Sequence, residues 1–177
     1  MHSQLEKVLK LAMLDNQEIE MHKEKIEVNE LVLQAISHVA LQVEQREGSI
    51  ETHLDSTELF IEADFTHIEN VLVNILDNAN KYSPEKPTIL VSTHSDENWA
   101  YIKISDKGKG MTQEVRKQIF DRFYREERGN IHNVKGHGLG LSYALEMVKL
   151  HHGFVDVESH ENQGSLFTIK LPIYESE

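Results

Sequence analysis

The chain of 177 residues contains no cysteine, and proline is rare, with three residues. The absence of cysteine excludes disulfide bonds and thiolate metal sites, and it fits a reducing compartment. Basic residues are also scarce: 18 lysines and arginines stand against 30 aspartates and glutamates, so the formal net charge is −12. Because such a charge repels polyanions, we expect no nucleic acid among the partners.

Long hydrophobic runs are missing as well. No apolar stretch approaches the roughly 20 residues that a membrane-spanning helix needs, and the first residues, MHSQLEKVLK, lack the apolar core of a signal peptide. Neither an internal repeat nor a low-complexity linker is present. We therefore expect one soluble domain with a short extension, which makes no contact with a membrane.

Hydrophobic periodicity predicts the helices, and short alternating segments predict the strands. The predicted helices are residues 3–20, 28–48, 65–82, 112–120 and a segment that begins near Gly140; the predicted strands are 49–54, 58–63, two within 88–106 and a hairpin within 154–173. Gly48 and Gly153 are expected to cap the helices that they follow. Strands joined by short polar turns pair antiparallel, and three amphipathic helices must cover one face of their sheet. The expected fold class is α+β, a two-layer α/β sandwich.

The helix predicted at residues 65–82 carries the first sign of a ligand site. Its apolar residues fill one arc, and a polar stripe lies opposite, made of Asn70, Asn74, Asn78 and Lys81. Asparagine is a poor helix former, so each of the three costs up to ~0.7 kcal/mol relative to alanine. Solvated surface asparagines are one interpretation. The other is a site in which two amide oxygens bind Mg²⁺ and the lysine contacts a phosphate.

Two glycine-containing segments are further candidates. Asp106 ends a predicted strand and is followed by Gly108 and Gly110, which would form a tight turn or let the backbone approach a ligand. A GxGxG string stands directly before the last predicted helix, where free N–H groups could bind an anion. The sequence lacks GxxxxGK[ST], a GxGxxG after a strand, and the HRD and DFG strings, which excludes three familiar ways of binding a nucleotide.

Four segments in a fixed order resemble one family. NVLVNILDNANKYSP, DKGKGM, IFDRFYR and GHGLGLSYALEMVK are similar to the N, G1, F and G2 boxes of bacterial sensor histidine kinases. The resemblance covers residues 23–177, which are expected to form the catalytic ATP-binding domain. It implies the Bergerat-type sandwich shared with gyrase, Hsp90 and MutL, with a mixed, mainly antiparallel sheet covered on one face by three helices. Residues 1–22 resemble the C-terminal part of the second dimerisation helix, followed by a linker.

The resemblance assigns a role to each matching residue. Asn78 would bind Mg²⁺, and Asn74 would be a second anchor beside the metal. Lys81 and Arg125 would contact the phosphates, and with Asn74 they are the expected catalytic residues. Tyr82 would pack on adenine, whose amino group would donate to Asp106. The remaining residues expected to bind the nucleotide are Gly108, Gly110, Gly136, His137, Gly138, Leu139 and Gly140.

Two further features follow from the same resemblance. His137 stands where these kinases usually carry threonine or serine. The polar residues 126–135 match the ATP lid, for which Phe120 and Phe123 are expected to be hydrophobic anchors.

The implied function is transfer of the γ-phosphate of Mg-ATP to a histidine, and from there to an aspartate of a response regulator. None of the 11 histidines stands in the acceptor motif, so the chain resembles a kinase fragment that does not phosphorylate itself. In the whole protein, the resemblance implies a homodimer formed through the dimerisation and phosphoacceptor domain. It also implies a receiver-domain partner and a cytoplasmic location, as part of a membrane-anchored sensor.

Three alternatives remain open on the sequence. They are an anti-sigma-factor-type serine kinase, an ATPase of the same fold, and a nucleotide-binding module without activity.

Overall fold

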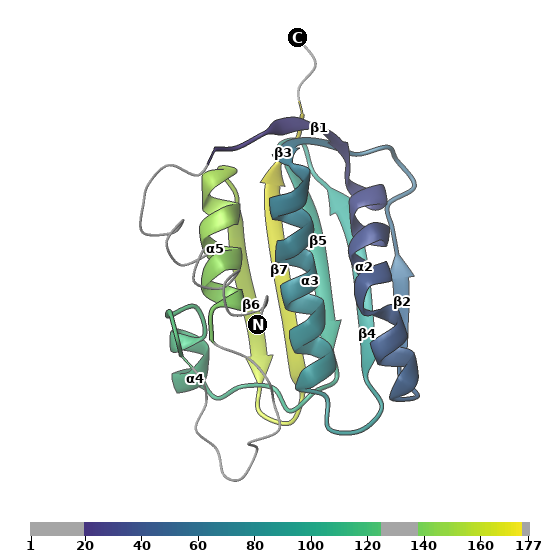
Figure 1. Cartoon of the computed structure of the whole chain (residues 1–177), viewed down its shortest axis with the longest axis vertical. Coiled ribbons are helices and arrows are strands. Elements are labelled where there is room, and N and C mark those ends of the chain that lie inside the picture. The colour runs from purple at the N-terminus through teal and green to yellow at the C-terminus, as the bar shows by residue number, and fades with distance from the viewer. Residues whose placement is uncertain (1–19, 125–137, 175–177) are drawn as a thin grey trace, which may run out of the picture.

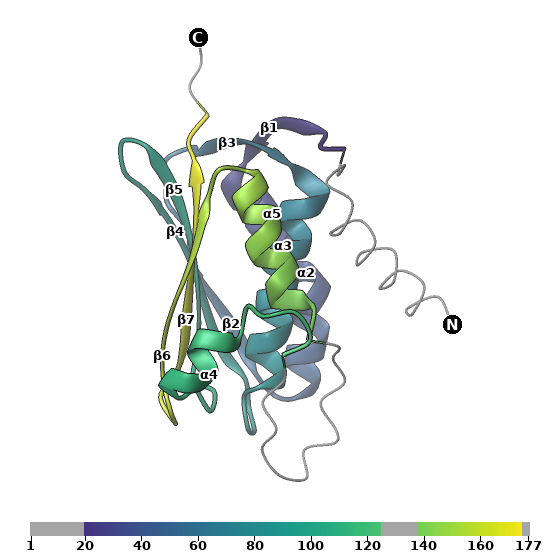
Figure 2. The same ribbon diagram turned by 90° about the vertical axis from the view of Figure 1, so that its left-hand side faces the viewer.

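The computed structural model describes residues 20–124 and 138–174. In this part of the chain, three helices lie side by side on one face of a sheet: α2 (Val28–Gln45), α3 (Phe65–Lys81) and α5 (Gly140–Leu150) (Figure 1). Seen from the side, the helices form one layer and the sheet the other, and no described helix covers the outer face of the sheet (Figure 2). The short α4 (Gln113–Gln118) lies near one end of the sandwich. The expected two-layer α+β sandwich is confirmed.

The large sheet is mixed and mainly antiparallel, as expected. Its five strands are β2 (Ser49–His53), β4 (Thr88–Ser95), β5 (Trp99–Asp106), β7 (Gly164–Pro172) and β6 (Phe154–His160), in that order across the sheet. The β2–β4 pair is parallel, and the other pairs are antiparallel. Inward-facing Phe167, Ile169 and Leu171 of β7 are all buried against the helices.

A small second sheet was not predicted. The strand β1 (Lys23–Glu27) pairs antiparallel with β3 (Phe60–Asp64), so the two strand-like segments at 49–54 and 58–63 belong to different sheets. The sequence of β1, KEKIE, has one buried residue, Ile26, and three exposed ones. With a single apolar residue there is no alternation for a sequence pattern to reveal.

The helix ends differ from the expected glycine caps. In both α2 and α5, a residue before the glycine takes the left-handed conformation: Glu47 has φ 55° and His152 has φ 59°. A Cβ on Gly48 would lie 2.5 Å from the Pro87 carbonyl oxygen, and one on Gly153 would lie 2.3 Å from that of Lys170. Glycine is therefore required at these two positions because another backbone approaches closely, not because of a positive φ.

Among the residues that the structure describes, no helix combines the length and the apolar character needed to cross a membrane.

Candidate functional site

The asparagines of the polar stripe predicted on α3 differ in their contacts. Asn74 and Asn78 are partly buried and lie one helical turn apart. Asn70 instead donates from its side-chain nitrogen to the carbonyl oxygen of Thr66, at 2.7 Å. The opposite face of the helix fixes this orientation, because it is packed into the core through Ile68, Val71, Leu72, Ile75, Leu76 and Ala79. Of the three asparagines, two are therefore placed to offer amide groups to a ligand.

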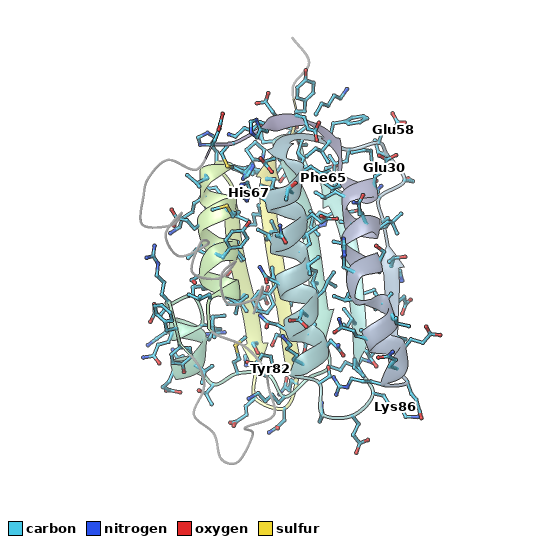
Figure 3. All side chains as sticks on the ribbon, in the orientation of Figure 1. Glu30, Glu58, Phe65, His67, Tyr82 and Lys86 are labelled. Carbon is cyan, nitrogen blue, oxygen red and sulfur yellow. The ribbon has the colours of Figure 1, made fainter. Side chains whose placement is uncertain are left out.

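Lys81 and Tyr82 lie at the C-terminal end of α3. The ammonium group of Lys81 forms an ion pair with Asp77, one turn earlier, and each of these side chains is about one-third exposed (33% and 30%). Exposed ion pairs of this kind are worth less than about 1 kcal/mol, so Lys81 can turn toward a phosphate at small cost. Tyr82 caps the helix and is 41% exposed, with Lys109 Nζ 5.1 Å from the centre of its ring. Figure 3 shows Tyr82 at this end of the sandwich.

Asp106 closes the row of inward-facing residues on β5. The alternation of that strand buries Ala100, Ile102 and Ile104, and it leaves Asp106 8% exposed. One oxygen of the carboxylate accepts from the N–H of Gly108 at 2.7 Å. Burial raises the pKa of Asp106, and hydrogen bonds from the backbone of Gly108 and Ser165 oppose this rise.

Gly108 brings Asp106 and Tyr82 together. A Cβ on Gly108 would lie 2.6 Å from Asp106 Oδ1 and 2.8 Å from the Tyr82 carbonyl oxygen, so a side chain has no room there. The Tyr82 carbonyl also accepts from the N–H of Lys109, at 3.2 Å. Tyr82 and Asp106, which the sequence assigned to adenine, thus meet at Gly108 in one corner, from the end of α3 and the end of β5.

The beginning of α5 contacts the polar stripe. A Cβ on Gly140 would lie 3.3 Å from Asn74 Oδ1, which places the first turn of α5 beside the amide of Asn74. The preceding residue, Leu139, is the N-cap and makes no side-chain capping hydrogen bond. Because the first N–H groups of a helix lack partners within the helix, this end can donate to an anion.

Two other glycines have backbone reasons for their presence. Gly110 has φ 60°, and a Cβ there would lie 1.9 Å from the His160 carbonyl oxygen in the β6–β7 turn. Gly138 has φ 69°, and its carbonyl accepts from the N–H of Phe123 at 2.9 Å. Gly138 therefore connects the IFDRFYR segment with the glycine-rich segment before α5, and Gly110 lets DKGKGM pack against the end of β6. Whether they contact a ligand stays a prediction.

The two phenylalanines of the IFDRFYR segment differ in their surroundings. Phe120 is partly buried and packs against the core, as expected of an anchor. Phe123 is 60% exposed and has φ 65°, so its ring does not pack into the described core. Since the lid lies outside the described residues, its role as an anchor for the lid stays a prediction. The backbone N–H of Phe123 donates to the Gly138 carbonyl oxygen and so links this segment to the start of the glycine-rich segment.

Several predicted features lie outside the described residues. They are Arg125, Gly136, His137, the lid segment 126–135 and the helix predicted at 3–20. The roles assigned to them stay predictions.

Asp64, at the other end of α3, was not predicted as a junction. Its carboxylate accepts from the N–H groups of His67 (3.0 Å) and His22 (2.9 Å). Its own N–H donates to Nε2 of His151, whose Nδ1 donates to the Met147 carbonyl oxygen at 2.7 Å. Burial raises the pKa of Asp64, but the two backbone hydrogen bonds and the electrostatic effect of His67 and His151 together outweigh it and hold the pKa below its usual value.

A cavity of about 330 Å³ lies beside this junction, far from Tyr82 (Figure 3). Its lining is Glu20, His22, Glu24, Asp64, Phe65, Thr66 and His67. The three carboxylates in this lining would repel a triphosphate.

Arg46, at the end of α2, was also missed by sequence reasoning. It looks like a basic residue that compensates the helix dipole, but it donates hydrogen bonds to the last turn of α3 and to the segment that follows. A sequence pattern gives no sign of such a contact, because the two segments are 34 residues apart or more.

A comparison with protein families identifies the domain that carries this site. Residues 63–175 match the family described as histidine kinase-, DNA gyrase B- and HSP90-like ATPase. The chain belongs to this family. Among its curated relatives, the sensor protein RprX of Bacteroides fragilis is 40% identical over 176 residues, which is 98% of this chain and 34% of that protein. The sensor histidine kinase WalK of Bacillus subtilis is 33% identical and is covered over 28% of its length. The chain thus spans about a third of these relatives.

Solved structures show the same fold. The structure of full-length ShkA in complex with AMPPNP superposes with a TM-score of 0.85 at 23% sequence identity. The match covers 98% of this chain and 36% of the ShkA chain. The histidine kinase ThkA, in complex with the response regulator protein TrrA, matches 97% of this chain and 48% of its own with a TM-score of 0.78 and 21% identity.

The family match covers the elements that carry the corner and the stripe. Residues 63–175 form the ATPase-type catalytic domain that sensor histidine kinases carry, and the N, G1 and G2 boxes lie on α3, after β5 and at the start of α5. Within the described ranges, no three histidine or carboxylate side chains form a metal cage. The amide oxygens of Asn74 and Asn78 fit the few protein ligands that Mg²⁺ needs beside a triphosphate and water.

Proposed function

We propose that the chain binds Mg-ATP and positions its γ-phosphate for transfer to a histidine of the dimerisation and phosphoacceptor domain. The observation that carries this proposal is the convergence of three boxes. The Asp106, Gly108 and Tyr82 corner lies at the end of α3, and the first turn of α5 lies against Asn74 of the same helix. One helix thus links a site for a base to a site for phosphates.

The base is selected at the corner. A carboxylate has about four lone-pair sites, and backbone N–H groups of Gly108 and Ser165 occupy part of this capacity at Asp106. The capacity that remains suits the exocyclic amino group of adenine, which is a donor, whereas guanine presents a carbonyl oxygen at that position. The exposed part of Tyr82 offers a ring face for the base to stack on.

The phosphates are held along the stripe. Lys81 lies at the C-terminal end of the stripe, and the first turn of α5 lies beside Asn74; both would neutralise phosphate oxygens. A bound Mg²⁺ would supply further charge neutralisation. Arg125 is proposed to approach the γ-phosphate. Transfer then depends on position and electrostatics, because phosphoryl transfer requires little covalent chemistry from the protein.

Water is not the proposed acceptor. Hydrolysis needs a general base to take a proton from water, and an ATPase of this fold places a glutamate where this chain has Asn74. A neutral amide cannot accept that proton at neutral pH, so the ATPase alternative is disfavoured.

The partners and location follow the relatives. We propose that the chain works with its own dimerisation and phosphoacceptor domain in a homodimer, of which residues 1–22 form part, and that 23–177 are the catalytic domain. A response regulator receiver domain is the proposed next carrier of the phosphate; ThkA, of the same fold, has been solved with such a protein. The proposed location is the cytoplasmic side of a membrane-anchored sensor.

The metal site is tested by Asn78→Ala. We expect this variant to keep its fold and to lose most of the affinity gain that Mg²⁺ gives to a non-hydrolysable ATP analogue, measured by calorimetry with and without Mg²⁺. Asn70→Ala is the matched control, since Asn70 lies on the same stripe but is bonded to its own helix. Equal Mg²⁺ dependence in parent and Asn78→Ala would remove Asn78 from the metal site.

A further inference from the structure

Arg46 makes an unusual set of contacts for a residue at a helix end. Its guanidinium donates to the carbonyl oxygen and to the side-chain Oδ1 (3.0 Å) of Asn80. It also donates to the carbonyl oxygens of Ser83 (2.7 Å) and Glu85 (3.1 Å). Asn80 and Ser83 are buried. Arg46 therefore caps α3 from a different helix, by supplying donors to carbonyls at and beyond its end.

The segment that Arg46 holds contains Tyr82. Further hydrogen bonds hold the same segment. Ser83 Oγ donates to the Ala79 carbonyl oxygen at 2.8 Å, and the Ser49 N–H donates to the Pro87 carbonyl oxygen at 2.7 Å. Tyr82 is therefore fixed from the α2 side by Arg46. From the β5 side it is fixed by the Lys109 N–H, which donates to its carbonyl.

The position of Tyr82 decides the geometry of the corner. Its carbonyl oxygen lies so close to Gly108 that a Cβ there would be 2.8 Å away, and the same Cβ would be 2.6 Å from Asp106 Oδ1. A shift of residues 80–85 would therefore alter the distance between the Tyr82 ring and the Asp106 carboxylate. The amides of Asn74 and Asn78 lie earlier on α3, within regular helix.

We propose that Arg46 is a positioning residue for the base, which sets the Tyr82 and Asp106 corner from outside the four boxes. This inference rests on the proposed function. A planar guanidinium with five donors can serve four acceptors at once, whereas a lysine ammonium has three donors and no fixed plane. Arg46→Lys keeps the charge and most of the stem but cannot keep the whole set of hydrogen bonds.

The test separates base recognition from phosphate binding. Affinities for non-hydrolysable ATP and GTP analogues are measured with and without Mg²⁺ in the parent and in Arg46→Lys. We expect ATP-analogue affinity to fall by about tenfold and GTP-analogue affinity to fall less, because guanine loses only the stacking on Tyr82. The gain from Mg²⁺ should stay as in the parent, so that discrimination between the bases shrinks.

Two other variants complete the experiment. Lys86→Met is the control. Lys86 lies in the same segment after α3 (Figure 3), is exposed and pairs with the exposed Glu47, so its removal should change neither affinity. Asn80→Ala removes one of the four acceptors and should reduce the discrimination in the same direction but less. If Arg46→Lys does not fold, the base discrimination measured in Asn80→Ala is the test of the inference.

The outcomes are distinct. Unchanged discrimination in the folded Arg46→Lys, or in Asn80→Ala where only that variant folds, overturns the inference. A parallel loss of ATP affinity, GTP affinity and Mg²⁺ gain also overturns it, because Arg46 would then only stabilise the fold. If the parent itself binds no ATP analogue, the proposed function fails instead.

Discussion

At the scale of single residues, Asp106 shows how a strand can produce a recognition group. Every second side chain of β5 points into the core, and the eighth residue of the strand is an aspartate in an apolar row. Burying a carboxylate is unfavourable, which is why burial raises the pKa of Asp106. The two backbone hydrogen bonds offset only part of this cost. The proposed ligand role accounts for an aspartate at this position, whereas fold stability does not.

Asp106→Asn should weaken adenine nucleotides by about 1 to 3 kcal/mol, because a charged acceptor is replaced in a buried hydrogen bond. In the parent, affinity for the ATP analogue should also decrease as pH is lowered, because the Asp106 carboxyl becomes protonated. Since the pKa of Asp106 lies above 3.8, this loss should begin at higher pH than for an ordinary aspartate. Calorimetry with an ATP analogue across a pH series measures both effects.

Two results would contradict this role for Asp106. One is a GTP analogue that competes with the ATP analogue as well as ATP itself does. The other is a pH dependence that is the same in Asp106→Asn as in the parent, with thermal unfolding used to confirm that the variant is folded.

At the scale of elements, α5 joins the two ends of the sandwich. Its first turn lies beside Asn74, and its last turn ends in His151, which is buried between the Asp64 N–H and the Met147 carbonyl. These two bonds require a neutral ring that donates from Nδ1 and accepts at Nε2. Protonation would put a second N–H against the N–H of Asp64. Burial is the main cause that lowers the pKa of His151; Lys23 and His67 lower it further, and Asp64 and the Met147 carbonyl oppose this.

The pKa of His151 predicts how stability depends on pH. Its folded value lies below 6.5, the ordinary value, so between the two values the unfolded chain binds more protons than the folded one. The free energy of unfolding should therefore decrease as pH falls below about 6.5. In His151→Gln this decrease should be smaller, as measured by urea unfolding at several pH values. His152→Gln, which changes an exposed neighbour, should keep the parent's slope; an equal slope in His151→Gln would contradict the prediction.

The elements also show what the sequence could predict. The helix at 65–82 was found because seven apolar residues and a polar stripe separate at helical spacing, and the structure ends it one residue earlier, at Lys81. β1 was missed because its pairing with β3, not its composition, makes it a strand. Arg46 and Asp64 were missed for a related reason: their partners lie far away in sequence, and no local pattern reports on them.

At the scale of the whole molecule, the chain holds a donor site without a recognisable acceptor. None of the 11 histidines has the acceptor context, and proximity supplies much of the rate in a transfer that depends on position. Incubated with γ-labelled Mg-ATP, the chain should bind nucleotide but acquire no acid-labile, alkali-stable phosphate. Addition of a dimerisation helix that carries a histidine followed by an acidic residue should restore labelling, slowly in trans and faster when it is fused in front of residue 1.

Asn78→Ala is the control in that experiment, and it should give no label in either arrangement. Label on one of the chain's own histidines would contradict the prediction, and His22 would be the first position to examine. Label on serine or threonine would favour the anti-sigma alternative instead.

The Asp64 junction has a mechanical consequence. The chain enters the domain at His22, whose N–H is fastened to the carboxylate of Asp64, and Lys23 lies opposite Asp64 in the small sheet. Asp64 also caps α3 through its carboxylate, and its N–H donates to His151 at the end of α5. A pull or twist applied to β1 would thus be transmitted through Asp64 to both α3 and α5. In the proposed site, α3 contributes Asn74 and α5 its first turn, so a displacement of that point would change the distance between these two parts.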